Sequence, residues 1–143
     1  MGESSLTYYI SEPNPGSGNV LVIQLDKTAV AGSQIALQIF YSTQQTSNAL
    51  TWLTPAQTAG GVYPYMFSQC EDINCRSVAP LQDTPSVKYT YGACVTVEKE
   101  LSPYMSANIT TVTPAANTNY TITCFIQQIP IADYLIAIAI GNI

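Results

Sequence analysis

Strict alternation of apolar and polar residues between Ser86 and Val97 is the clearest secondary-structure signal in the chain. Every second side chain is apolar or aromatic, beginning with Val87, Tyr89 and Tyr91, which is the period of a half-buried β-strand. Shorter runs of strand type lie at residues 20–25, 34–41, 63–69, 101–105, 120–126 and 134–140. Short strands separated by turns about every ten residues predict an all-β fold.

Proline, glycine and polar residues separate these runs. They mark residues 1–19 as a turn-rich lead-in and residues 20–143 as a single β domain. The motif Thr54-Pro55-x-Gln57 combines a capping residue with a proline at the first helical position, which predicts one helical turn. We expect residues 110–118 to form a loop, and the last two strands to be joined through Pro130.

The composition predicts one packed domain with an unusually uncharged surface. A chain of 143 residues with 47% hydrophobic residues is large enough to build a core. Charged residues make up only 9%, so Ser, Thr, Asn, Gln and Tyr must cover much of the surface. A net charge of −5 with four Lys and Arg argues against binding nucleic acid. The absence of His excludes a His-ligated zinc, a Ser-His-Asp triad and a Cys-His pair within this chain.

The four cysteines, at positions 70, 75, 94 and 124, are too few to define a disulfide scaffold in a domain of this size. Cys70 and Cys75 are too widely spaced for a typical zinc knuckle, and Cys94 and Cys124 lie on strand-like segments. We therefore favour buried free thiols, with one disulfide or a metal site as the alternatives.

Neither end of the chain predicts a membrane segment. The first five residues lack the basic start and apolar core of a signal peptide. The apolar tail at 134–143 is too short to cross a bilayer, which takes about 20 residues, and is expected to be a buried strand.

Five of the 13 charged residues lie in a cluster that follows Ser68: Glu71, Asp72, Arg76, Asp83 and Lys88. Arg76, the only arginine, can pair with Asp83 or Asp72 as a structural ion pair that clamps a turn, and Asp83 is the favoured partner. Gln69 and Glu71 are two residues apart on an extended segment, so both can present acceptors on one side. For these two residues, binding a cationic ligand group and a purely structural role stay equally open.

Several motifs occur in the same order as in a known family. They are Trp52-Leu53-Thr54-Pro55-x-Gln57-Thr58, Pro64-Tyr65-x-Phe67-Ser68-Gln69-Cys70, Cys75-Arg76, Gln82-Asp83-Thr84-Pro85-Ser86-Val87-Lys88, Lys99-Glu100-Leu101, Met105-Ser106-Ala107, Ile129-Pro130-Ile131 and Tyr134-Leu135-Ile136-Ala137. From Val20 to its C-terminus the chain thereby resembles the N-terminal domain of the leukotriene A4 hydrolase-like zinc aminopeptidases, in the gluzincin class.

This resemblance implies an all-β fold of saddle-like, twisted antiparallel sheets, truncated here at its N-terminus. It also implies that Gln69 and Glu71, with Asp72 beside them, lie at the mouth of an active site and hold the α-amino group of a peptide. In the family, zinc and the catalytic residues belong to a later domain with an H-E-x-x-H helix, which this sequence lacks. We therefore expect no cofactor and no peptidase activity in this chain by itself.

Two functions follow as hypotheses. The first is a non-catalytic domain that anchors the substrate's amino group for a zinc aminopeptidase. The alternative is a stand-alone interaction module that assembles through exposed sheet edges, as a homo-oligomer or with a partner chain. The resemblance implies a cytoplasmic protein. The sequons at Asn108 and Asn119 would carry glycans in a secreted one, although chance occurrence is the favoured explanation.

Overall fold

The computed structural model describes residues 5–13 and 18–143, and within them it contains β-strands and short 3₁₀ turns but no α-helix. The predicted all-β fold is confirmed. Pro15 and Gly16 of the expected lead-in lie outside the described residues. The chain divides into two compact units, Met1–Tyr41 and Ser42–Ile143. No helix in the described part of the chain is long and apolar enough to cross a membrane.

The first unit contains a small antiparallel pair of strands, β1 (Tyr8–Ile10) and β2 (Leu21–Ile23). β1 falls inside the segment that we expected to be only turns. The strand predicted at residues 34–41 is wrong, because no strand forms there. Ile35 and Leu37 remain 52% and 48% exposed, so alternation without a neighbouring strand to pair with does not produce a sheet.

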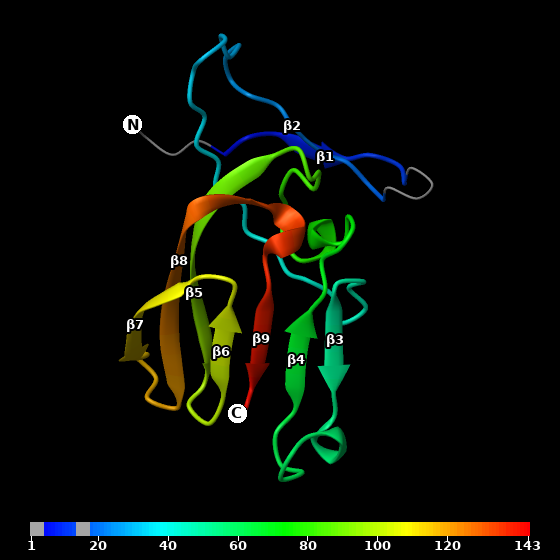
Figure 1. Ribbon diagram of the computed structural model, residues 1–143. Helices are drawn as coiled ribbons and strands as arrows, with labels where there is room; N and C mark the ends of the chain where they lie inside the picture. The colour runs from blue at the N-terminus through cyan, green and yellow to red at the C-terminus, as the bar shows by residue number, and fades with distance from the viewer. Residues whose placement is uncertain (1–4, 14–17) are drawn as a thin grey trace. The chain divides into compact units, whose positions relative to one another are not determined.

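The second unit begins with a four-stranded antiparallel sheet in the order β3-β4-β9-β6, in which the four strands run side by side (Figure 1). Its strands are β3 (Leu50–Leu53), β4 (Tyr65–Ser68), β6 (Ser102–Met105) and β9 (Ile138–Gly141). The predicted helical turn follows β3 as the 3₁₀ turn η1 (Pro55–Gln57). The Thr54 N–H donates to Gln57 Oε1 at 3.0 Å, as a capping residue pair should.

A three-stranded antiparallel sheet in the order β5-β8-β7 completes this unit, and β5 passes next to β6. Its strands are β5 (Lys88–Glu98), β8 (Tyr120–Ala132) and β7 (Asn108–Pro114). The loop predicted at residues 110–118 is wrong, because β-branched residues there form most of β7. β8 also continues beyond its predicted end at residue 126. Its register against β5 shifts next to Pro130, where a bulge accommodates a residue without an N–H.

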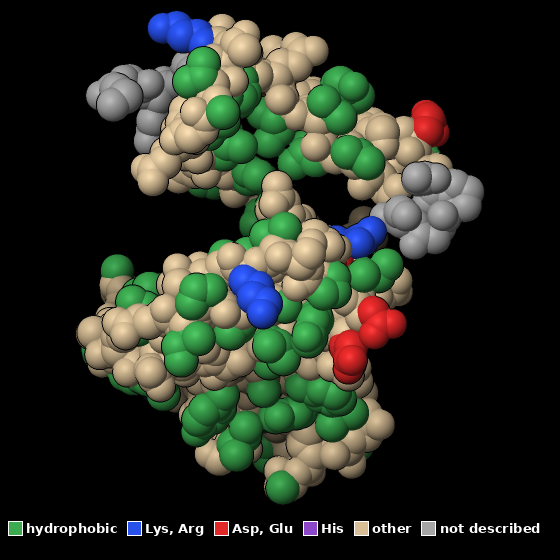
Figure 2. Space-filling view, turned by 45° about the horizontal axis from the view of Figure 1, so that its top comes forward, with side chains coloured by type: hydrophobic (Ala, Val, Ile, Leu, Met, Phe, Trp, Pro, Cys, Tyr) green, Lys and Arg blue, Asp and Glu red, His purple; other side chains and the backbone are tan. Residues whose placement is uncertain are grey.

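Buried side chains come from both sheets of the second unit, and include Met66 on β4, Val97 on β5 and Phe125 on β8. A separate buried cluster consists of Ala49, Cys70 and Cys75, with four partly buried side chains around it: Val78, Leu81, Tyr134 and Ile136. Figure 2 shows hydrophobic side chains over much of the visible surface and few charged ones, in agreement with the low charge content. Cys70 of this separate cluster lies between Gln69 and Glu71, two of the predicted substrate-binding residues.

Candidate functional site

The predicted substrate-binding residues lie in the loop that leads from the end of β4 to the 3₁₀ turn η2 (Cys75–Ser77). Gln69, Glu71 and Asp72 are all exposed, whereas Cys70 is 2% exposed and belongs to the buried cluster. The inward Cys70 between two outward residues places Gln69 and Glu71 on the solvent side of the loop. Both acceptors therefore lie on an accessible surface of this loop.

Two disulfides correct the expectation of free thiols. Cys70 bonds to Cys75, with their Cα atoms 4.6 Å apart. Cys94 on β5 bonds to Cys124 on β8, and the two residues are direct partners in the strand register. The Cys94–Cys124 pairing depends on which strands become neighbours, and spacing along the sequence does not reveal this. The first disulfide closes a short loop around Glu71 and Asp72, whose backbone it thereby restrains.

Backbone hydrogen bonds fix the same loop. The Gln69 N–H donates to Ala49 O at 2.7 Å, and the Asn74 N–H donates to Cys70 O at 2.8 Å. The Asn74 side chain donates to Glu71 O at 2.9 Å. The loop thus has a restrained backbone, while the side chains of Gln69 and Glu71 stay exposed.

Arg76 and Asp83 form the ion pair that joins η2 to the turn before β5. Asp83 Oδ2 accepts from Arg76 Nε at 2.7 Å and from the Arg76 backbone N–H at 3.0 Å, while Arg76 Nη2 donates to Asp83 O at 3.1 Å. Burial alone raises the pKa of Asp83, but hydrogen bonds from Asp133 and Arg76 and the guanidinium charge outweigh it, so the net pKa is lowered. Arg76 and Asp83 therefore clamp the segment that carries the candidate site.

Sequence reasoning missed Asp133, which begins the 3₁₀ turn η3 (Asp133–Leu135) and is 0% exposed. Its Oδ1 accepts from the Tyr134 N–H at 2.9 Å. Burial, together with the hydrogen bond and the charge of Asp83, raises the pKa of Asp133. Cys75 Sγ lies 3.2 Å from Asp133 O, and because this sulfur is in a disulfide, the contact is packing. The only available signal was an acidic residue inside an otherwise apolar C-terminal segment.

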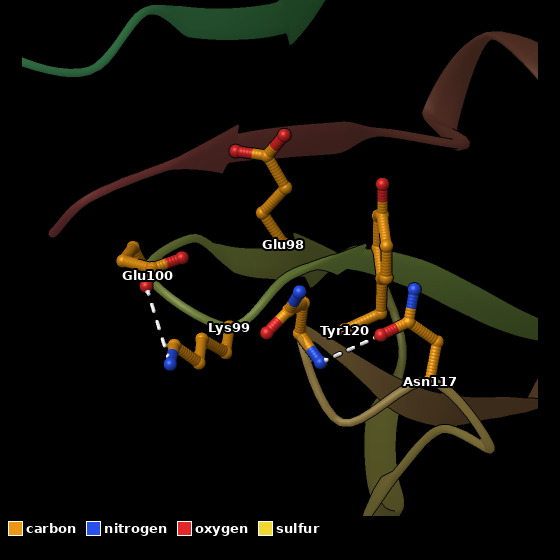
Figure 3. A pocket seen from close by; sticks show the side chains of 6 residues that line it. Glu98, Lys99, Glu100, Asn117 and Tyr120 are labelled. Atoms are coloured by element: carbon orange, nitrogen blue, oxygen red, sulfur yellow. Dashed lines mark hydrogen bonds and ion pairs between the residues drawn. The ribbon is translucent and has the colours of Figure 1, made fainter.

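A polar hollow of about 340 Å³ lies next to Glu98, the last residue of β5 (Figure 3). It is lined by Glu98, Lys99, Glu100, Asn117, Asn119 and Tyr120. Lys99 and Glu100 point toward one another there at 3.8 Å, and the Asn119 N–H donates to Asn117 Oδ1 at 3.1 Å. Of the predicted site residues, the hollow contains the possible glycosylation site Asn119 but none of the predicted substrate-binding residues.

The residues present do not fit a zinc site. All four cysteines are in disulfides, the sequence contains no His, and nowhere in residues 5–13 and 18–143 do three or more acidic, Cys or His side chains gather to hold a metal. Structural and catalytic zinc sites both need at least three such ligands. The chain's own chemistry at this site is therefore hydrogen bonding and charge.

Residues 10–135 match the Peptidase M1 N-terminal domain family. The chain belongs to this family. Similar curated proteins include leukotriene A-4 hydrolase of Xenopus laevis, 40% identical over 94% of this chain. Leucine aminopeptidase 2 of Sclerotinia sclerotiorum is 34% identical over 99% of the chain. This M1 N-terminal domain spans 22% and 24% of the lengths of those two proteins.

Solved structures show the same relationship for the M1 N-terminal domain. Native yeast LTA4 hydrolase matches with a TM-score of 0.73 and 33% identity, over 96% of this chain and 20% of that one. The M1 zinc metallopeptidase from Deinococcus radiodurans matches with a TM-score of 0.51 and 27% identity, over 54% of this chain and 17% of that one. The antiparallel sheets described above are those of an M1 peptidase N-terminal domain.

The remaining predicted sites lie at or next to β7. Asn108, the first residue of β7, and Asn119 in the following turn are both exposed, and glycosylation at either one stays a prediction. β7 is also an edge strand whose residues are all exposed. Association with a partner chain at such an edge likewise stays a prediction.

Proposed function

We propose that this M1 N-terminal domain binds the free α-amino group of a peptide through Gln69 and Glu71, as the substrate-anchoring part of a zinc aminopeptidase. The observation that supports this most directly is the loop itself. Gln69 and Glu71 are exposed on either side of the buried, disulfide-bonded Cys70. An aminopeptidase cleaves from the free N-terminus, and one of the relatives is named for that activity.

The chemistry of these side chains suits an ammonium group. An ammonium has three N–H donors and no acceptor, whereas an ionised Glu offers two acceptor oxygens and Gln offers one amide oxygen. A hydrogen bond between an ammonium and a carboxylate is charge-assisted and stronger than a neutral one. Asp72 adds a second negative charge next to Glu71, and within the described residues neither carboxylate forms an ion pair. Both charges are therefore available to attract a cation.

Restraint of the loop backbone favours binding as well. A loop that already has its bound conformation loses little conformational entropy when the ligand arrives. The disulfide and the hydrogen bonds from Gln69 and Asn74 supply that restraint. The site is therefore preorganised around the two acceptors.

An NMR titration with a tripeptide and its N-acetylated form tests this proposal. The free peptide should shift the amide signals of residues 69–74 at millimolar concentration, and the acetylated one should not. Glu71→Gln removes a charge-assisted bond of about 1.5–3 kcal/mol, which at this exposed position corresponds to a Kd weaker by about tenfold. Glu98→Gln, an exposed carboxyl on β5, is the matched control and should leave the Kd unchanged. Equal binding of the two peptides would refute the amino-group assignment.

We further propose that the bond-breaking groups lie outside this sequence. The sequence contains no His, and the donor side chains present do not fit zinc. The purified 143-residue chain should therefore show no zinc-dependent release of amino acids from an aminopeptidase substrate. Zinc-dependent turnover that co-purifies with the chain, and that a mock preparation lacks, would contradict this.

A further inference from the structure

We propose that the buried carboxyl groups of Asp83 and Asp133 share one proton, which Asp133 carries and donates to Asp83, and that this proton holds the turn around η2 against η3. The inference concerns the support of the loop and stands independently of peptide binding.

The first observation is a pair of buried oxygens without donors. The side chain of Asp83 is 3% exposed, and Asp133 is 0% exposed. With both carboxyls ionised, Asp83 Oδ1 and Asp133 Oδ2 have no hydrogen-bond partner among the residues described. Buried polar atoms are almost always hydrogen-bonded. If both carboxyl groups were ionised, these two buried oxygens would therefore lack a hydrogen-bond donor.

The second observation is how the other carboxylate oxygens are occupied. Asp83 Oδ2 accepts twice from Arg76, and Asp133 Oδ1 accepts from the Tyr134 N–H. Both residues lie against the same turn: Asp83 Oδ2 is 2.7 Å from Arg76 Nε, and Asp133 O is 3.2 Å from Sγ of the preceding residue, Cys75. Each of the two carboxyl groups also shifts the pKa of the other. A single proton on Asp133 would supply a donor to the free oxygen of Asp83, and both buried atoms would then have a partner.

The charges around the pair decide which residue carries the proton. The Arg76 guanidinium contacts Asp83 and keeps it ionised, and the lowered pKa of Asp83 agrees with this. Among the residues that the structure describes, no cation pairs with Asp133, and its pKa is raised by burial and by Asp83. Ionising two neighbouring carboxyl groups costs electrostatic free energy, because the two negative charges repel each other. The proton therefore resides on Asp133.

Other titratable groups face the pair from β5. The hydroxyl of Tyr89 is buried without a partner in the described residues, and burial, Asp133 and Asp83 all raise its pKa. Tyr89 thus stays neutral alongside the pair. Lys88 lies opposite Ala132 in the β5–β8 register and is exposed. A metal ion is a weaker fit than a proton, because Arg76 already neutralises Asp83 and no cluster of three acidic, Cys or His ligands occurs in the described part.

The pair makes stability depend on pH in a defined direction. An unfolded Asp loses its proton near pH 4, whereas folded Asp133, with its raised pKa, keeps its proton to higher pH. The contribution of the protonated Asp133 to the free energy of unfolding is fully present below about pH 4. It is lost as the pH rises through the pKa of Asp133 in the folded state. In between, unfolding releases one proton, so the unfolding equilibrium constant rises about tenfold per pH unit. Asp133→Asn keeps a neutral donor in the same place and removes this dependence.

The test compares urea unfolding of the wild-type chain and Asp133→Asn from pH 4 upward. The ratio of their unfolding constants, wild type over variant, should rise about tenfold per pH unit until Asp133 ionises. Tyr89→Phe is a control for phenol ionisation and should keep the wild-type slope. A ratio that does not change with pH, or a slope lost in Tyr89→Phe, would overturn the proposal.

A direct measurement on the wild-type chain covers the case in which Asp133→Asn does not fold. The sequence has only four Asp, so ¹³C labelling of their side chains can follow each carboxyl through a pH titration. The Asp133 carboxyl should titrate well above pH 4 and the Asp83 carboxyl below it. Titration of the Asp133 carboxyl at about pH 4 would overturn proton sharing. Stabilisation of the wild type, but not of Asp133→Asn, by magnesium or calcium would also overturn it, because a metal ion would then occupy the place of the proton.

Discussion

Replacing Gly141 with alanine should lower the stability of the chain by about 3 kcal/mol. Gly141 is buried at the end of β9, next to Ile140, which pairs with Met66 of β4. A Cβ at position 141 would lie 3.1 Å from Tyr65 Cε2 and 3.4 Å from Cγ, and it would meet Cδ2 far inside van der Waals contact. The ring or β9 must move to admit even one methyl group, and well-packed interiors resist such shifts.

A second strand glycine supplies the control. Gly92 on β5 is exposed, and the nearest heavy atom to an added Cβ is Phe125 O at 3.7 Å, an ordinary contact. Gly92→Ala should therefore unfold at nearly the wild-type urea concentration, whereas Gly141→Ala unfolds well below it with an unchanged m-value. Adding Tyr65→Ala to Gly141→Ala should recover part of the loss as a coupling energy. Equal midpoints for the two alanine variants would contradict the contact described here.

Elements were predicted correctly from the sequence where the pattern of their own residues, alternation or capping, determines the local structure. The alternation from Ser86 to Val97 became β5, and the capping motif at Thr54 became η1. The errors occurred where pairing decides the outcome. The alternating residues at 34–41 have no partner strand in the described part, while residues 108–114 became β7 despite Pro114, because β8 offers an edge.

For the same reason, the sequence could predict the exposure of the candidate residues but not the contacts around them. Gln69, Glu71 and Asp72 are local in sequence, and the exposure of Gln69 and Glu71 follows from the buried Cys70 between them. The Cys94–Cys124 disulfide depends on strand register, since its two residues are 30 positions apart. The burial of Asp133 depends on tertiary contact with the η2 turn, as the 3.2 Å distance between Cys75 Sγ and Asp133 O shows. Spacing along one chain carries no information on such contacts.

Arg76→Met should destabilise the chain by about 2–3 kcal/mol at pH 7, because it removes the guanidinium charge and the side-chain hydrogen bonds to Asp83 Oδ2 and to Asp83 O. The backbone N–H of residue 76 can still donate to the nearly buried Asp83 carboxylate. The figure stays below that of a fully buried pair because the Arg76 side chain is 36% exposed and partly screened by water. Methionine keeps much of the apolar stem, so the loss reports the charge and its donors.

The effect of Arg76→Met should also depend on pH in the direction opposite to that of Asp133. Asp83 has a lowered pKa, so its contribution is present above the unfolded value near 4 and is lost as the pH falls through the folded pKa. Urea unfolding at pH 7 and about pH 3 should therefore show a large difference from wild type at pH 7 and a smaller one in acid. Lys99→Met is the matched control: its ion pair with Glu100 spans 3.8 Å, its side chain is 57% exposed, and its loss should cost at most about 0.5 kcal/mol. If the two methionine variants unfold alike at pH 7, the clamp formed by Arg76 and Asp83 contributes no more than a surface ion pair. The η2 turn must then be held by the Cys70–Cys75 disulfide and the packing of the buried cluster.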